Sequence, residues 1–101
     1  MKETIIKFEE GPFPKKYTAF IRNKKTHKIR KIHFGDRRYQ QYKDRTPLHL
    51  YSKFNHFTKK RQENYFSRHS KTKKRKEAIK KEKRKSHGLY NAKILSHEYL
   101  W

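Results

Sequence analysis

The chain has 101 residues, with 30 Lys and Arg against 9 Asp and Glu, and a formal net charge of +21. Because it has no cysteine, disulfides, thiolate zinc sites and cysteine nucleophiles are excluded. No run approaches the ~20 apolar residues of a membrane span, so none is predicted.

The aromatic content separates this chain from a disordered basic tail. Aromatic residues make up 15% of the chain, whereas disordered segments are poor in them. A domain of this size has a thin core, to which aromatic rings must contribute much of the apolar surface. We therefore expect one small domain over residues 1–101, with these core side chains: Phe20, Ile32, Phe34, Tyr65, Leu95, Leu100 and Trp101.

The first half of the chain has the pattern of β-structure. Residues 4–8 form a β-prone run that Gly11 and Pro12 close. Residues 16–22 and 28–34 flank a polar stretch, and Ile32 and Phe34 alternate with polar or basic neighbours as in a half-buried strand. We predict a hairpin from these two runs, with residues 4–8 as a possible third strand.

The predicted hairpin is followed by Gly35 and Asp36, which break the strand pattern. Asp36 is a suitable cap for a single helical turn, in which Tyr39 and Tyr42 share one face. A folded centre over residues 16–70 then continues into a helix that begins after Thr58 and runs to about residue 69.

Ten of the fifteen residues from 71 to 85 are Lys or Arg. Lys and Glu favour helix, but like charges four residues apart oppose it. This run is predicted to be a helix when neutralised, or a frayed basic arm when free. Residues 86–101 form a C-terminal segment anchored by Trp101. The fold class is thus α+β: an N-terminal β-hairpin or three-stranded sheet followed by two or three short helices.

The positive charge lies between residues 16 and 85 and predicts contact with phosphates, which gives affinity without sequence information. A solvated surface is the alternative for any single basic helix, but here the excess spans differently structured segments. The predicted partner is nucleic acid, with DNA favoured, or else acidic proteins. The predicted contacts are Arg37, Arg38, Lys43, Arg45, Lys59, Lys60, Arg61, Arg68, Lys73, Lys74, Arg75, Lys76, Lys80, Lys81, Lys83, Arg84 and Lys85.

The aromatic residues interleaved with these charges allow two interpretations. They can stack on exposed bases, as in single-strand binders, or they can form the core of the domain. The scarcity of Leu, Ile and Val favours the core, with Tyr39 and Tyr42 the best candidates for exposure.

Seven histidines raise the hypothesis of a metal-dependent nuclease. Its residues would be His33, Asn55 and His56 with Asp36 or Asp44. No histidine pair has strong metal-ligand spacing, so we predict a non-enzymatic protein with no metal and no cofactor. An alternative role is a buried hydrogen-bonded network made by His33, Tyr39, Tyr42, His56 and His69.

Five short motifs resemble a family of small basic proteins encoded by nucleocytoplasmic large DNA viruses, with shorter relatives in tailed phages. These motifs are His33-Phe34-Gly35, Tyr39-Gln41-Tyr42-Asp44, Tyr51-Ser52-His56, Tyr65-Arg68-His69 and Leu100-Trp101. They extend over about two-thirds of the chain. Relatives often have Asp-rich residues near the position of Phe57 and Thr58, and this departure argues against a metal site here.

The resemblance implies a viral protein located in the virion, and in the host cytoplasm or nucleus during infection. The family supplies no settled activity. Its context favours genome packaging or compaction by this strongly basic chain. It equally allows a minor capsid or other structural role, with protein–protein contacts at the inner shell.

Overall fold

The computed structural model describes residues 1–101. Its N-terminal third is a three-stranded antiparallel sheet of β1 (Glu3–Glu10), β2 (Tyr17–Asn23) and β3 (Ile29–Phe34), in the order β1-β2-β3. The loop between β2 and β3 is shaped by Asn23, whose side-chain oxygen accepts hydrogen bonds from two backbone N–H groups of the loop. The predicted hairpin and third strand are confirmed.

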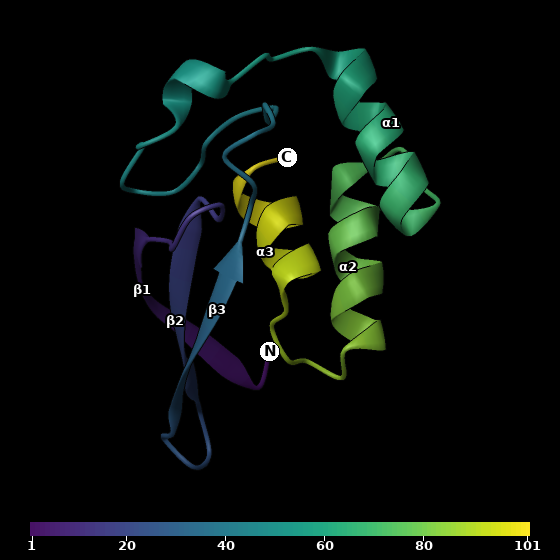
Figure 1. The fold of residues 1–101 in the computed structure, drawn as a ribbon. Helices are drawn as coiled ribbons and strands as arrows, with labels where there is room; N and C mark the ends of the chain where they lie inside the picture. Colours follow the sequence, from purple (N-terminus) through teal and green to yellow (C-terminus); the bar gives the residue numbers. More distant parts are fainter.

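Four helical elements follow: the 3-10 turn η1 (Ser52–Phe54), then α1 (Lys59–Ser70), α2 (Arg75–Lys85) and α3 (Ala92–Tyr99). Figure 1 shows all three α-helices on one side of the sheet, with α3 beside β3 and with α1 and α2 beyond it. The α+β class, with a three-stranded sheet followed by helices, is therefore confirmed. None of the helices combines the length and apolarity that crossing a bilayer requires.

The lysine-rich run is an integral helix of the domain, not a projecting arm. Ala78 and Glu82, four residues apart on α2, are buried against the neighbouring helices. The Lys81 ammonium donates a hydrogen bond to the Ser70 carbonyl oxygen at the end of α1 (2.9 Å). Packing of one narrow face therefore holds α2 in place despite its charge.

The prediction of a helical turn after Asp36 was wrong. The Asp36 carboxylate accepts a hydrogen bond from the Arg38 N–H, and the Asp36 carbonyl accepts one from the Tyr39 N–H. These bonds make a tight turn, after which the chain has no helix until η1. Asp caps turns as readily as helices, so the residue alone did not decide between them.

The core has two parts, joined by the C-terminal residue. One part lies between the sheet and α3 and contains Tyr17, Ala19, Ile21, Phe34, Tyr51, Leu95 and Leu100. The other lies between α1 and α2 and contains Tyr65, Phe66 and Ala78. Trp101 is half-buried and packs against both parts.

Among the predicted core residues, Phe34, Tyr65, Leu95 and Leu100 are buried, and Ile32 and Trp101 are half-buried. Phe20 is half-buried as well, but it lies on the opposite face of the sheet and so outside the core. Tyr17, Ala19 and Ile21 occupy the core side of β2, and alternation along a strand sends Phe20 outward.

Two buried polar clusters hold the long segment from residue 35 to 57. The Asp44 carboxylate accepts hydrogen bonds from the Tyr17 hydroxyl, from the hydroxyl and N–H of Thr46, and from the Tyr51 N–H. The Lys16 ammonium donates to the Tyr39 carbonyl (2.8 Å) and to the Gln41 side chain. Burial lowers the pKa of Lys16 to about 8. These bonds replace secondary structure in fixing the segment.

Candidate nucleic-acid interface

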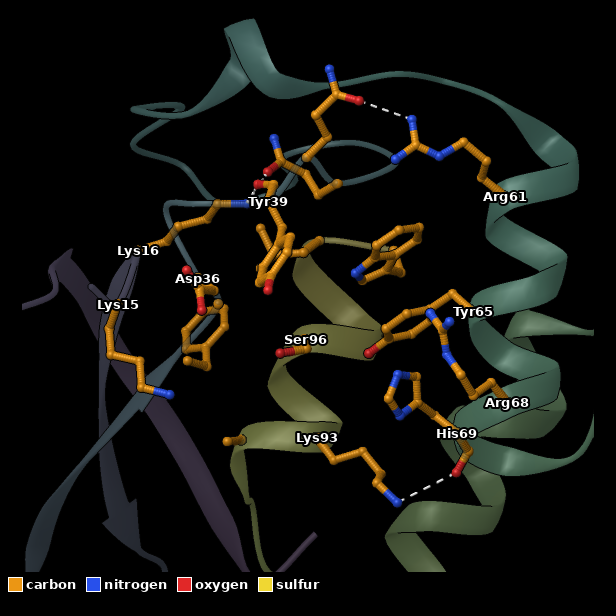
Figure 2. A pocket seen from close by; sticks show the side chains of 17 residues that line it. Lys15, Lys16, Asp36, Tyr39, Arg61, Tyr65, Arg68, His69, Lys93 and Ser96 are labelled. Carbon is orange, nitrogen blue, oxygen red and sulfur yellow. Dashed lines mark hydrogen bonds between the residues drawn. The ribbon is translucent and has the colours of Figure 1, made fainter. Parts of the chain in front are cut away.

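A cleft of about 640 Å³ lies between α1, α3 and the segment that leaves β3. Figure 2 shows its walls: Arg61, Tyr65, Arg68 and His69 come from α1, and Ser96 and Lys93 come from α3. Lys15, Lys16, Asp36 and Tyr39 face them from the other side. Phe34, Leu100 and Trp101 contribute apolar lining. The cleft combines aromatic surface with a positively charged rim.

The rim carries four cations from three separate segments of the chain: Lys15 before β2, Arg61 and Arg68 on α1, and Lys93 on α3. Arg61 donates a hydrogen bond to the Gln40 side chain (2.9 Å), and Lys93 lies 3.8 Å from Glu82. Asp36 is the only acidic residue lining the cleft, and it is paired with Arg38 at 2.7 Å. An anion in the cleft therefore meets an excess of positive charge.

Aromatic rings line the cleft from both sides. On one side the rings of Tyr65 and Trp101 are stacked, with centroids 4.2 Å apart. On the other, Tyr39 is 66% exposed and its ring extends into the cleft in Figure 2. The exposed ring of Tyr39 is separate from the core stack, so it offers a surface on which a flat group such as a nucleobase can stack.

His69 also lies in this wall. Burial, followed by the nearby charges of Arg68 and Lys93, lowers its pKa. Its ring lies against Tyr65, with centroids 4.5 Å apart. The lowered pKa favours the neutral imidazole, which can donate or accept a hydrogen bond, so the cations of the rim supply most of the attraction for an anion.

Next to the cleft, and sharing Arg61 and Arg68 with it, the helices present a strongly basic surface, which we call the helix face. It is formed by α1, α2 and the turn between them, and it contains the exposed residues Lys59, Lys60, Arg61, Arg68, Lys73, Lys74, Lys76, Lys80, Arg84 and Lys85. Of the three acids on these helices, Glu77 is exposed, Glu63 is half-buried and Glu82 is buried. A second hollow, of about 650 Å³, lies at the end of α2 and is lined by Lys2, Lys80, Lys83, Arg84 and His87 among others.

Several of the predicted phosphate contacts are engaged inside the protein instead. Lys83 pairs with Glu98 at 2.6 Å, and Lys81 is bonded to the Ser70 carbonyl. Arg75 donates to the Glu98 carbonyl oxygen (2.7 Å), and burial lowers its pKa. These three residues lie on the inner side of α2, which the sequence could not separate from the outer side because both are basic.

The predicted contacts on the segment between β3 and α1 are also divided. Arg37 donates hydrogen bonds to the backbone carbonyls of Lys15 and Gly11, so its guanidinium stabilises the connection between β1 and β2. Arg38 is paired with Asp36, and Arg45 is half-buried with its guanidinium 6.0 Å from the Tyr42 ring centroid. Lys43 is exposed, outside the cleft and the helix face.

The sequence missed the cleft residues Lys15, Gln40 and Lys93. Lys93 stands alone in a neutral segment, and Lys15 precedes a strand, so neither belongs to a charge run. Only the folding of α3 between the sheet and α1 brings them to one site.

The residues of the nuclease hypothesis have other partners. His33 shares a hydrogen bond with Thr18 (2.7 Å), Asp44 is enclosed by its donors, and His56 packs against Trp101 with ring centroids 5.3 Å apart. Asn55 accepts hydrogen bonds from the Gln41 side chain and the Asp44 N–H. No group of three or more His, Asp or Glu side chains is placed to hold a metal ion.

The predicted network of His33, Tyr39, Tyr42, His56 and His69 is not formed, because these side chains lie on different elements with separate partners. Tyr42 contacts His56 and Phe57 edge-on, whereas Tyr39 is exposed and His33 is on the sheet.

No protein-family model, curated protein sequence or solved structure matches the chain.

Proposed function

We propose that this protein binds nucleic acid, DNA being the favoured form, through phosphate contacts and without catalysing a reaction. The observation that carries the proposal is the helix face, where exposed cations adjoin the cleft and have almost no acidic partners. Each phosphate that such a cation neutralises releases a condensed counterion, and this release provides affinity independent of sequence.

The nucleic-acid backbone lies along α1 and α2. The cleft receives a part of the polymer that is not regular duplex. Arg61 and Arg68 belong to both the helix face and the cleft, so they connect the two regions. Arg is suited to this position because its planar guanidinium pairs with two phosphate oxygens at once. A base that is unpaired or at an end can stack on Tyr39.

The biological setting follows from the resemblance to the viral family. A protein of this charge serves to package or compact a DNA genome in the virion, where the polyanion is concentrated and the +21 charge is screened.

The test is a binding titration against a duplex of random sequence at several salt concentrations. We expect log K to fall linearly with log salt, by about 0.9 for each phosphate contacted on B-DNA. Scrambling the sequence should leave the affinity unchanged. Absence of binding at low salt, or an affinity indifferent to salt, would contradict the proposal.

A second function is favoured by a separate observation. Phe13, Leu48, Leu50, Phe57 and Leu89 are between 40% and 76% exposed, so their apolar surface is available for contacts with another protein. These side chains suit contacts with other proteins of a viral shell. Fractionated virions distinguish the two functions, because a shell protein stays with emptied, nuclease-treated capsids and a genome-bound protein leaves with the DNA.

A further inference from the structure

The outer face of the sheet is uncovered, because the helices all lie on the other side (Figure 1). Residues directly opposite one another in antiparallel strands share a face. Phe20 pairs with Lys7 and with Lys31, and Arg22 pairs with Thr4 and with Ile29. Because Ile21 points into the core, these residues all point outward.

Cations dominate this face, which we call the sheet face. Lys7 and Lys31 lie over the ring of Phe20 from its two sides, with ammonium nitrogens 4.5 Å and 5.3 Å from the centroid. Both lysines are exposed, so their charges remain at the surface. Lys7 is paired with Glu9 at 2.8 Å, but Arg22 and Lys31 have no acidic partner.

The hairpin loop extends this face with further charge. Lys24, Lys25 and Lys28 are all exposed, and the loop contains no acid. The bonds that Asn23 accepts from the loop backbone hold it in one shape without engaging any of these three ammonium groups. A cationic surface therefore runs from the middle of the sheet to its hairpin end.

We infer that one molecule of this protein bridges two nucleic-acid segments, one on the helix face and the other on the sheet face. The inference rests on the proposed function, since it assigns a second site of the same chemistry. The contacts run from the sheet through α3 to α2 and then α1, so the two faces lie on opposite sides of the molecule. One segment cannot cover both faces without bending around the domain, whose extents are 40 × 28 × 19 Å.

Bridging is favourable because the protein places positive charge between two nucleic-acid segments that repel each other. A protein with cations on one side only coats a duplex, and it leaves neighbouring duplexes to repel across the free side. With cations on both sides, each face releases counterions from its own segment. The exposed charge on two faces thus converts binding into crosslinking, which is what compaction requires.

A capture assay tests the inference. One short duplex is immobilised on beads, and the protein is added below saturation. Capture of a second, fluorescent duplex is then measured, while the affinity for a single duplex is measured by anisotropy. The sheet-face variant is R22E/K31E. The matched control is K43E/K53E, which makes the same change in charge at exposed residues between β3 and α1.

We expect R22E/K31E to bind a single duplex within about twofold of the control but to capture the second duplex at least about tenfold less, because two phosphate contacts become two repulsions. Equal capture by R22E/K31E and the control would overturn the inference. A dimer of the free protein in sedimentation would also overturn it, because the two helix faces of one dimer would then hold the two duplexes. If the wild-type protein fails to bind even one duplex, the proposed function itself fails.

Discussion

The rings of Tyr65 on α1 and Trp101 at the C-terminus are stacked in parallel, with centroids 4.2 Å apart and an angle of 4° between their planes. The Gln62 side chain, one turn earlier on α1, donates a hydrogen bond to the Trp101 carbonyl oxygen (2.7 Å). The last residue of the chain thereby joins the helices to the sheet core and forms part of the cleft wall.

Replacing Trp101 by Ala should lower the free energy of unfolding by about 2 kcal/mol, because a half-buried stacked ring is lost. Urea unfolding followed by circular dichroism measures the change. Trp101→Phe is the control, because it keeps a ring against Tyr65, and it should lose clearly less. Equal losses in the two variants would show that stacking is not what Trp101 contributes.

Trp101 is the only tryptophan of the chain, so its fluorescence reports on the cleft. Single-stranded oligonucleotides should change this fluorescence on binding, and Tyr39→Ala should reduce the change by removing the exposed ring across the cleft. A saturable binding curve with no change in Trp101 emission would mean that the polymer stays outside the cleft.

Removing two cations of the rim with R61Q/R68Q should reduce the slope of log K against log salt by about 1.8, since two phosphate contacts are lost. K43Q/K53Q makes the same change in net charge away from the cleft and the helix face. If both variants change the slope equally, the binding depends on total charge, and Arg61 and Arg68 have no special position.

Asp44→Asn should lower the free energy of unfolding by about 2 kcal/mol, since an amide cannot accept every hydrogen bond that the buried carboxylate accepts. Urea unfolding is again the measurement. Glu77→Gln, which removes the same charge at an exposed carboxylate, is the control and should change stability little. A harmless Asp44→Asn would imply that the segment from 35 to 57 is held by other contacts.

His97 is fully buried, and its hydrogen bonds show which ring nitrogen carries the hydrogen in the neutral imidazole. Ser70 donates its hydroxyl hydrogen to Glu82 (2.9 Å), so it must accept the hydrogen bond from Nε2 of His97 (2.8 Å). Nδ1 then accepts from the Tyr65 hydroxyl (2.9 Å). Burial lowers the pKa of His97 from its usual 6.5 to about 4. A proton on Nδ1 would leave the Tyr65 hydrogen without its acceptor.

This depressed pKa predicts that stability is lost on acidification. Between pH 6.5 and 4 the unfolded chain takes up a proton at His97 and the folded chain does not, so unfolding becomes easier as the pH falls. The loss amounts to about 3 kcal/mol by pH 4. His97→Gln should show a shallower fall over this interval, and the other histidines provide the background common to both proteins. Identical pH profiles would mean that His97 does not contribute to the loss.

Much of the fold was predictable from the sequence because it depends on local patterns. Alternation in residues 28–34 predicted β3, and Thr58 at the start of a mixed apolar and basic run predicted α1. For residues 71–85 the local charge could not decide between a helix and a disordered basic arm. The burial of Ala78 and Glu82 decided for the helix, since packing against α1 and α3 is a long-range contact.

The sequence by itself determined that the chain is strongly basic, has an aromatic-rich core and forms a sheet followed by helices, because composition and short-range periodicity carry that information. Only the tertiary structure decided which cations are free. Arg75, Lys81 and Lys83 are engaged within the protein, whereas Lys15 and Lys93 join Arg61 and Arg68 around the cleft. The physical reason is that a run of basic residues has no buried and exposed sides until its helix packs against the rest of the domain. Likewise, residues 15, 61 and 93 come to one cleft only through contacts between segments that are far apart in the sequence.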